Sequence, residues 1–256
     1  MKSDKIILVT NDDGISAKGI LFLSKLASEF GEVWVVAPDR PRSGSGHAIT
    51  LCDPLRTERT HFHQIENEYT CSGTPADCVK LAVNKYLPRK PDLLLSGVNH
   101  GHNLSINVLY SGTMSAVLEG ALSKIPSIGF SFFDHNSNAD FSPCTEIISS
   151  ILSSVLDFSG EHPLCLNVNI PKVQPGRIPK LKVCRAARGN WIEEFDGRND
   201  PSGKPYYWLA GNFVNFEEGN SETDLYHFER GFATIVPIDY DLTDHAKLND
   251  VKNLFP

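Results

Sequence analysis

Four consecutive aliphatic residues at positions 6–9 lead almost directly into the adjacent carboxylates Asp12 and Asp13, which Gly14 follows. An apolar run without polar alternation is typical of a strand buried on both faces, as in parallel sheets. Because Asp and Gly fit poorly into a packed strand, we expect the strand to end here with both carboxylates at its carboxyl end. Adjacent like charges resist ionisation unless a cation offsets them, and a hard divalent ion suits oxygen ligands. The alternative is a turn in which an Asp caps the next helix.

Strand and helix patterns alternate through residues 1–171 and predict a Rossmann-like, three-layer α/β core with a mostly parallel sheet. The first unit is a strand, a helix and a second strand at residues 32–37, which implies a parallel pair. Further strands are expected at 92–96, 125–133 and 164–169, and helices at 75–86, 111–122 and 145–156. Residues 49–71 have the short runs of an inserted hairpin, and we do not expect another crossover there.

The alternation stops after Pro171, and residues 172–256 are predicted to form a C-terminal extension. It would contain a hairpin arm at about 191–216, a return strand at 233–237 and a short terminal helix near 246–254. The arm holds seven of the 24 aromatic residues. An isolated hairpin is marginally stable and an exposed aromatic patch favours association, so we expect the arm to join subunits. The alternative is that the arm folds back over its own domain.

The charge, the cysteines and the apolar runs of the chain limit what the protein can bind and where it can be located. A formal net charge of −7 argues against binding to polymeric nucleic acid. Six cysteines without a C-x-x-C pair predict free thiols and a cytoplasmic protein. We find no apolar run long enough for a signal peptide or a membrane span.

Two pairs of histidines are candidates for a functional role. His61 and His63 would share one face of a strand, but without a third ligand nearby we expect them to be solvated. His100 and His102 follow the third predicted core strand. A substrate or proton-transfer role is open to them, although loop histidines are more often ordinary surface residues.

Polar residues follow three consecutive strands of the predicted sheet. The first strand ends in Asp12 and Asp13, the second leads to Ser43 in a glycine-rich loop, and the third leads to Asn99 and Asn103. Ligands of open parallel sheets bind outside the carboxyl ends of the strands. Carboxylate, hydroxyl and amide oxygens together favour Mg²⁺ or Mn²⁺ over copper or structural zinc.

A helix predicted to begin at Ser111-Gly112-Thr113 adds backbone N–H groups and two hydroxyls, which suit a phosphate. Two rival motifs are absent, since there is no G-x-G-x-x-G fingerprint after a strand and no Walker lysine sequence. The sequence therefore predicts a metal and phosphate site.

Several ordered motifs resemble the SurE family of survival-protein nucleotidases. They are Val9-Thr10-Asn11-Asp12-Asp13-Gly14, Ala37-Pro38-Asp39-Arg40-Pro41-Arg42-Ser43-Gly44, Gly73-Thr74-Pro75-Ala76-Asp77, Ser96-Gly97-Val98-Asn99-His100-Gly101, Tyr110-Ser111-Gly112-Thr113 and Leu166-Asn167-Val168-Asn169-Ile170-Pro171. One departure is Asn107, where many relatives have an acid. It leaves the predicted metal site intact but changes the charge of the nearby loop.

The resemblance implies a phosphatase of nucleoside 5′- and 3′-monophosphates that uses one divalent ion per subunit. It implies that Asp12, Asp13, Ser43 and Asn99 hold the ion and that Asn103, Ser111 and Thr113 lie beside it. It also implies homodimers or homotetramers that exchange C-terminal segments. The full predicted set is Asn11, Asp12, Asp13 and Asn103 for catalysis, and Gly44, Ser111, Gly112 and Thr113 for the substrate phosphate.

We expect metal-activated water to attack the phosphate, because Asp-Asp-Gly is not the Asp-x-Asp pattern of phosphatases with an aspartyl nucleophile. Three alternatives remain open at this stage. They are a covalent aspartate, a nucleotide-binding regulator with little turnover, and a broader phosphatase that also acts on short polyphosphate.

Overall fold

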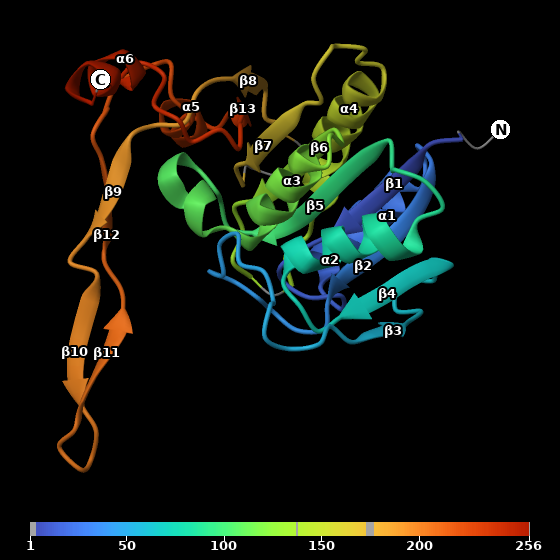
Figure 1. Cartoon of the computed structure of the whole chain (residues 1–256), viewed down its shortest axis with the longest axis horizontal. Coiled ribbons are helices and arrows are strands. Elements are labelled where there is room, and N and C mark those ends of the chain that lie inside the picture. The colour runs from blue at the N-terminus through green and yellow to red at the C-terminus, as the bar shows by residue number, and fades with distance from the viewer. Residues whose placement is uncertain (1–3, 137, 173–176, 256) are drawn as a thin grey trace.

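In the part of the chain that the structure describes, nine strands form one sheet in the order β3-β4-β2-β1-β5-β6-β7-β13-β8 (Figure 1). The computed structural model describes residues 4–136, 138–172 and 177–255. The strands of this sheet are β1 (Ile6–Thr10), β2 (Glu32–Pro38), β3 (Thr57–Arg59), β4 (Asn67–Cys71), β5 (Leu93–His100), β6 (Ser127–Phe132), β7 (Cys165–Ile170), β8 (Leu181–Val183) and β13 (Ala233–Pro237). The neighbours from β4 to β7 run parallel, so the predicted mostly parallel α/β fold is confirmed.

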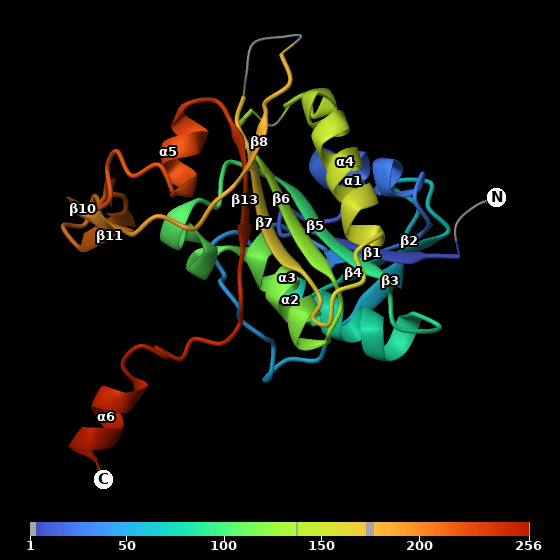
Figure 2. The same ribbon diagram turned by 90° about the horizontal axis from the view of Figure 1, so that it is seen from above.

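Helices cover both faces of the sheet. The helices are α1 (Lys18–Ala27), α2 (Pro75–Leu81, continued by a π-helical turn at Ala82–Tyr86), α3 (Gly112–Leu122), α4 (Thr145–Leu156), α5 (Asp224–Glu229) and α6 (Leu248–Leu254). Figure 2 shows α1 and α4 on one face and α2 and α3 on the other. Strands β1 and β6 are buried along their whole length, as expected of strands covered on both sides.

The hairpin predicted within residues 49–71 extends the main sheet. Strands β3 and β4 are antiparallel, but β4 also pairs in parallel with β2. The connection from β2 to β4 is therefore a crossover, and our expectation of no further crossover was wrong. The connection has no helix of its own, so it lacks the helical period by which a crossover is recognised in a sequence.

The prediction that His61 and His63 are both solvated was wrong for His63. The His63 side chain is buried, and its Nδ1 lies 3.4 Å from Oε2 of buried Glu68. Glu68 also accepts hydrogen bonds from the backbone N–H groups of Phe62 and His63, so this pair stabilises the loop that leads into β4.

The C-terminal part adds strands to the sheet and projects an arm away from it. Strand β13 pairs antiparallel with β7 and parallel with β8. Two antiparallel strand pairs, β9 (Gly189–Ile192) with β12 (Asn212–Asn215) and β10 (Phe195–Asn199) with β11 (Pro205–Leu209), form the arm. The arm extends outward from the core in Figure 1, so it does not fold back over its own domain.

Two short helices complete the chain. Helix α5 was not predicted, since six residues are too few to establish a helical period. Its Asp224 is buried and accepts hydrogen bonds from the backbone N–H groups of Ser105 and Ala187. Helix α6 has no buried residue and stands apart from the sheet in Figure 2. Within the described residues, no helix combines the length and apolarity needed to cross a membrane.

Candidate active site

A cavity of about 430 Å³ lies where β1, β2 and β5 end. It brings together all four predicted metal ligands, Asp12, Asp13, Ser43 and Asn99. Three other predicted site residues, Gly44, Asn103 and Ser111, also line it. The remaining lining residues are His100, Gly101, His102, Asn107, Tyr110, His135 and Trp191. The carboxyl ends of neighbouring parallel strands thus meet at this edge of the sheet, as predicted.

Local backbone contacts bring the two acidic residues and the Ser43 loop together. Gly14 has a φ of +94°, and an added Cβ would lie 3.2 Å from the Arg40 carbonyl carbon. The backbone N–H of Arg42 donates to the Asp12 carbonyl at 2.7 Å. A glycine is therefore needed where the turn after β1 packs against the loop after β2.

The two carboxylates are held in an environment that opposes their charge. Burial raises the pKa of Asp12 to about 6, and repulsion from Asp13 adds to this rise. Burial also raises the pKa of Asp13, while the nearby His100 opposes the rise. The Oδ2 atom of Asp13 is buried and has no hydrogen-bond partner among the described residues. A cation beside this pair would offset both the burial and the repulsion.

These residues fit a hard divalent ion. The cavity offers oxygens from two carboxylates, from Ser43 and from the side-chain amide of Asn99. Among the described residues, no three His, Cys, Asp or Glu side chains are grouped so as to hold a metal ion. An ion bound here would therefore need the neutral oxygens beside Asp12 and Asp13, a ligand set typical of Mg²⁺ or Mn²⁺ and not of structural zinc.

The start of α3 packs directly on Asp12. A Cβ on Gly112 would lie 2.6 Å from the Asp12 Cβ, so only glycine allows this approach. Thr113 is fully buried and donates its hydroxyl to Asp12 Oδ1 at 2.6 Å. Its backbone N–H also favours the ionised Asp12 and lowers the pKa of that carboxyl. The amino end of the helix thus stabilises Asp12, as its dipole favours an anion.

Of the three residues expected to bind phosphate at this helix start, only Ser111 lines the cavity. Its hydroxyl oxygen accepts the backbone N–H of Met114 at 3.1 Å and caps the helix. Gly112 and Thr113 lie behind Asp12, on which they pack. Direct contact with a bound group is therefore open to Ser111 and Gly44, while Gly112 and Thr113 support the carboxylate.

Asn103 and Asn11 have different surroundings. The side chain of Asn103 donates to Ser131 at 2.9 Å, and its backbone N–H donates to Asn169 at 2.7 Å. These bonds fix the Asn103 amide at the cavity wall. Asn11 is buried, does not line the cavity, and donates its Nδ2 to the Gly14 carbonyl at 2.9 Å. Asn11 therefore orients the turn that carries the carboxylates.

Several lining residues were missed or undervalued at the sequence level. His100 and His102 are half-buried cavity residues, which favours the substrate or proton-transfer role over that of ordinary surface residues. Burial lowers the pKa of His102 and favours its neutral imidazole. The position of the two histidines after a core strand was a usable signal. His135 and Trp191 come from distant segments, and no sequence motif marked them.

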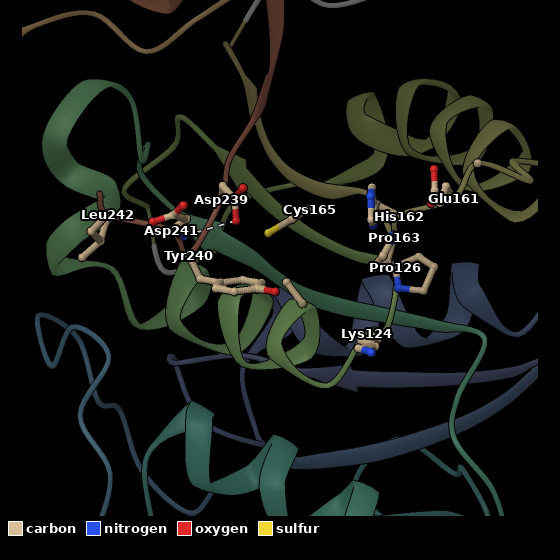
Figure 3. A pocket seen from close by; sticks show the side chains of 12 residues that line it. Lys124, Pro126, Glu161, His162, Pro163, Cys165, Asp239, Tyr240, Asp241 and Leu242 are labelled. Carbon is tan, nitrogen blue, oxygen red and sulfur yellow. Dashed lines mark hydrogen bonds between the residues drawn. The ribbon is translucent and has the colours of Figure 1, made fainter. Parts of the chain in front are cut away.

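A second hollow of about 1110 Å³ lies away from these residues (Figure 3). Figure 3 shows Asp239, Tyr240 and Asp241 on one side of Cys165 and Glu161 and His162 on the other. It lies near the start of β7, at the opposite edge of the sheet from the carboxylate pair. Among the described residues, none of its lining side chains has a buried polar atom without a partner. The smaller cavity is therefore the better candidate for catalysis.

Comparisons with known proteins agree with this geometry. Residues 7–193 match the family described as Survival protein SurE. The chain belongs to the SurE family. It is 50% identical over 254 residues to a protein of Christiangramia forsetii named 5′-nucleotidase SurE, covering 98% of this chain and 97% of that protein. It is 49% identical over 250 residues to the protein of the same name from Cytophaga hutchinsonii, covering 97% and 96% of the two chains.

A solved member of the SurE family has the same fold. The crystal structure of the SurE protein from Aquifex aeolicus matches with a TM-score of 0.83 and 37% identity. The match covers 97% of this chain and 99% of that one. The nine-stranded sheet and its C-terminal additions thus lie within a fold already seen in this family.

Thr113 provides a test of how Asp12 is held. Thr113→Val removes the hydroxyl that donates to Asp12 while keeping the size of the side chain. We expect the Mn²⁺ concentration for half-maximal phosphate release to rise roughly tenfold at pH 7, because a hydrogen bond to a charged group contributes about 1.5–3 kcal/mol. A Mn²⁺ titration measures this, with Thr113→Ser as the control that keeps the donor. An unchanged half-maximal concentration in Thr113→Val would contradict the role assigned to the hydroxyl.

Proposed function

We propose that this chain is a divalent-metal-dependent 5′-nucleotidase that also hydrolyses 3′-monophosphates, with one Mg²⁺ or Mn²⁺ per subunit. The observation that carries the proposal is the adjacent pair of buried Asp12 and half-buried Asp13 in a cavity with Ser43 and Asn99, where one buried Asp13 oxygen has no partner among the described residues. Membership of a family whose relatives are named 5′-nucleotidase supports the choice of substrate.

Seven residues of the cavity have a part in the proposed reaction. Asp12 and Asp13 would hold the ion with their charges, and Ser43 and Asn99 would complete its oxygen ligands. When bound, the ion neutralises phosphate oxygens and lowers the pKa of its water. Ser111 and Gly44 border the space left for the phosphate. The neutral imidazole of His102 is suited to accept a proton within the same cavity.

The decisive experiment measures inorganic phosphate released from 5′-AMP and 3′-AMP by the purified full chain. We expect release with Mg²⁺ or Mn²⁺ and loss of release with excess EDTA, restored when either ion is added back. Binding of AMP without release would favour a regulatory protein. Release that is insensitive to EDTA would contradict the metal site.

We also propose that the arm and α6 join subunits into a homodimer or homotetramer. The arm exposes Phe195, Tyr207, Trp208 and Leu209, and α6 exposes Leu254. Exposed apolar side chains on segments that extend from the core favour docking on a second copy. A cytoplasmic location remains a prediction, favoured by cysteines that are all free in the described residues.

A further inference from the structure

Several of the residues that line the cavity carry aromatic or imidazole rings. Trp191, Tyr110, His102 and His135 all line the same cavity as Asp12 and Asp13. A divalent ion and a phosphate require charges and polar donors, and they gain little from an indole. These rings are therefore available to a different part of the substrate.

The Trp191 ring is held in place from two sides. Its Nε1–H donates to Asn107 Oδ1 at 3.0 Å. Its ring packs edge-to-face with Phe213 at 5.7 Å between centroids. Phe213 in turn packs against a buried cluster that includes Leu104 and Phe228. An aromatic ring fixed before the ligand arrives loses little conformational freedom on binding.

Glycine allows the arm to place this ring. A Cβ on Gly189 would lie 2.3 Å from the Phe213 Cζ, so the Phe213 ring covers the backbone of β9. Trp191 is two residues further along the same strand, on the side that meets Asn107. The root of the arm, where β9 pairs with β12, thus contributes Trp191 to the cavity.

We infer that Trp191 is the stacking surface for the base of a nucleoside monophosphate and that Asn107 positions it. The inference rests on the proposed nucleotidase function and adds a subsite to it. Every nucleobase has a π face, and stacking on an aromatic side chain contributes about 1–3 kcal/mol per base. The subsite would separate nucleotides from sugar phosphates that lack a base.

The test compares 5′-AMP with ribose 5-phosphate, which has the same sugar and phosphate but no base. We expect Trp191→Ala to lower the ratio of kcat/KM for AMP to that for ribose 5-phosphate by at least about fivefold. The loss should be in the KM for AMP and not in kcat. Trp191→Phe should restore most of the ratio, and Phe62→Ala, which removes an exposed aromatic outside the cavity, should leave it unchanged.

Asn107 is tested as a positioning residue through the same ratio. Asn107→Leu removes the acceptor for Trp191 and should lower the ratio, whereas Asn107→Asp keeps an acceptor and should preserve it. The added charge of Asn107→Asp should raise the KM for both phosphates alike. This pattern separates loss of ring position from general damage to the cavity.

Equilibrium binding of adenosine provides a second measurement that does not depend on turnover. Adenosine should quench tryptophan fluorescence in the parent, and this quenching should be lost in Trp191→Phe. An unchanged KM for AMP in Trp191→Ala, or equal losses for both substrates, would overturn the inference. If the parent releases no phosphate from AMP with any divalent ion, the proposed function itself fails, and adenosine binding still tests the stacking surface.

Discussion

Replacing Asp13 by Asn, or Asp12 by Asn, is expected to reduce phosphate release from AMP by more than about 100-fold at saturating Mn²⁺. Residues that merely support a metal ligand cost about 10–100-fold when changed, and these two carboxylates supply the only acidic groups of the cavity within the described residues. The measurement is the initial rate of phosphate release. Asp53→Asn, which removes an exposed carboxylate outside the cavity, is the matched control.

The same change should stabilise the metal-free protein. The pKa of Asp12 is raised from 3.8 to about 6, so the folded chain holds this proton more tightly than the unfolded chain. The favourable contribution of Asp12 is therefore present at low pH and is lost as the pH rises through about 6. At pH 7, the free energy of unfolding of metal-free Asp12→Asn should exceed that of the parent by up to about 3 kcal/mol. This difference should shrink toward pH 4.

The parent and the variants should also differ in their response to metal. An ion that binds the folded chain raises its stability by mass action. Mn²⁺ should therefore raise the melting temperature of the parent and hardly change that of Asp13→Asn. Full activity of either variant at saturating Mn²⁺, with a folded protein, would show that the ion and the reaction lie elsewhere.

Shortening the arm is expected to lower the mass of the assembly in solution. The structure suggests removing residues 194–210 and joining Glu193 to Gly211 through an Asn-Gly turn. The paired strands β9 and β12 stay, and with them Trp191 and Phe213. The deleted part carries large exposed apolar side chains, and their loss removes the surface that we expect to bury between subunits. Light scattering of the parent and the variant gives the two masses.

A point variant tests the same surface without a deletion, and it decides the question even if the shortened chain does not fold. Leu209→Lys places a charge on an arm residue that is 73% exposed, so the stability of a single subunit should not change. We expect this variant to weaken association while its melting transition stays cooperative. If both variants keep the mass of the parent, the arm does not join the subunits.

Residue order alone established the layers of the fold and most of the site. The unbroken apolar runs in β1, β2 and β5 are typical of strands that are covered on both faces, and helical patterns alternate with the strands, so this part of the fold was predictable. The polar residues that follow these strands were predictable for the same reason, since strand direction determines which edge they reach. Asp12, Asp13, Ser43 and Asn99 thus meet in one cavity as expected.

Tertiary packing decided what each residue does within that cavity. Thr113 and Gly112 follow Ser111 in the chain, yet the approach of α3 turns them toward Asp12 and leaves Ser111 at the cavity wall. Trp191 reaches the site only because the root of the arm packs against Asn107, 84 residues away in sequence. Local sequence carries periodicity and turn chemistry, whereas contacts between distant segments depend on shape and burial that arise only when the whole chain has folded.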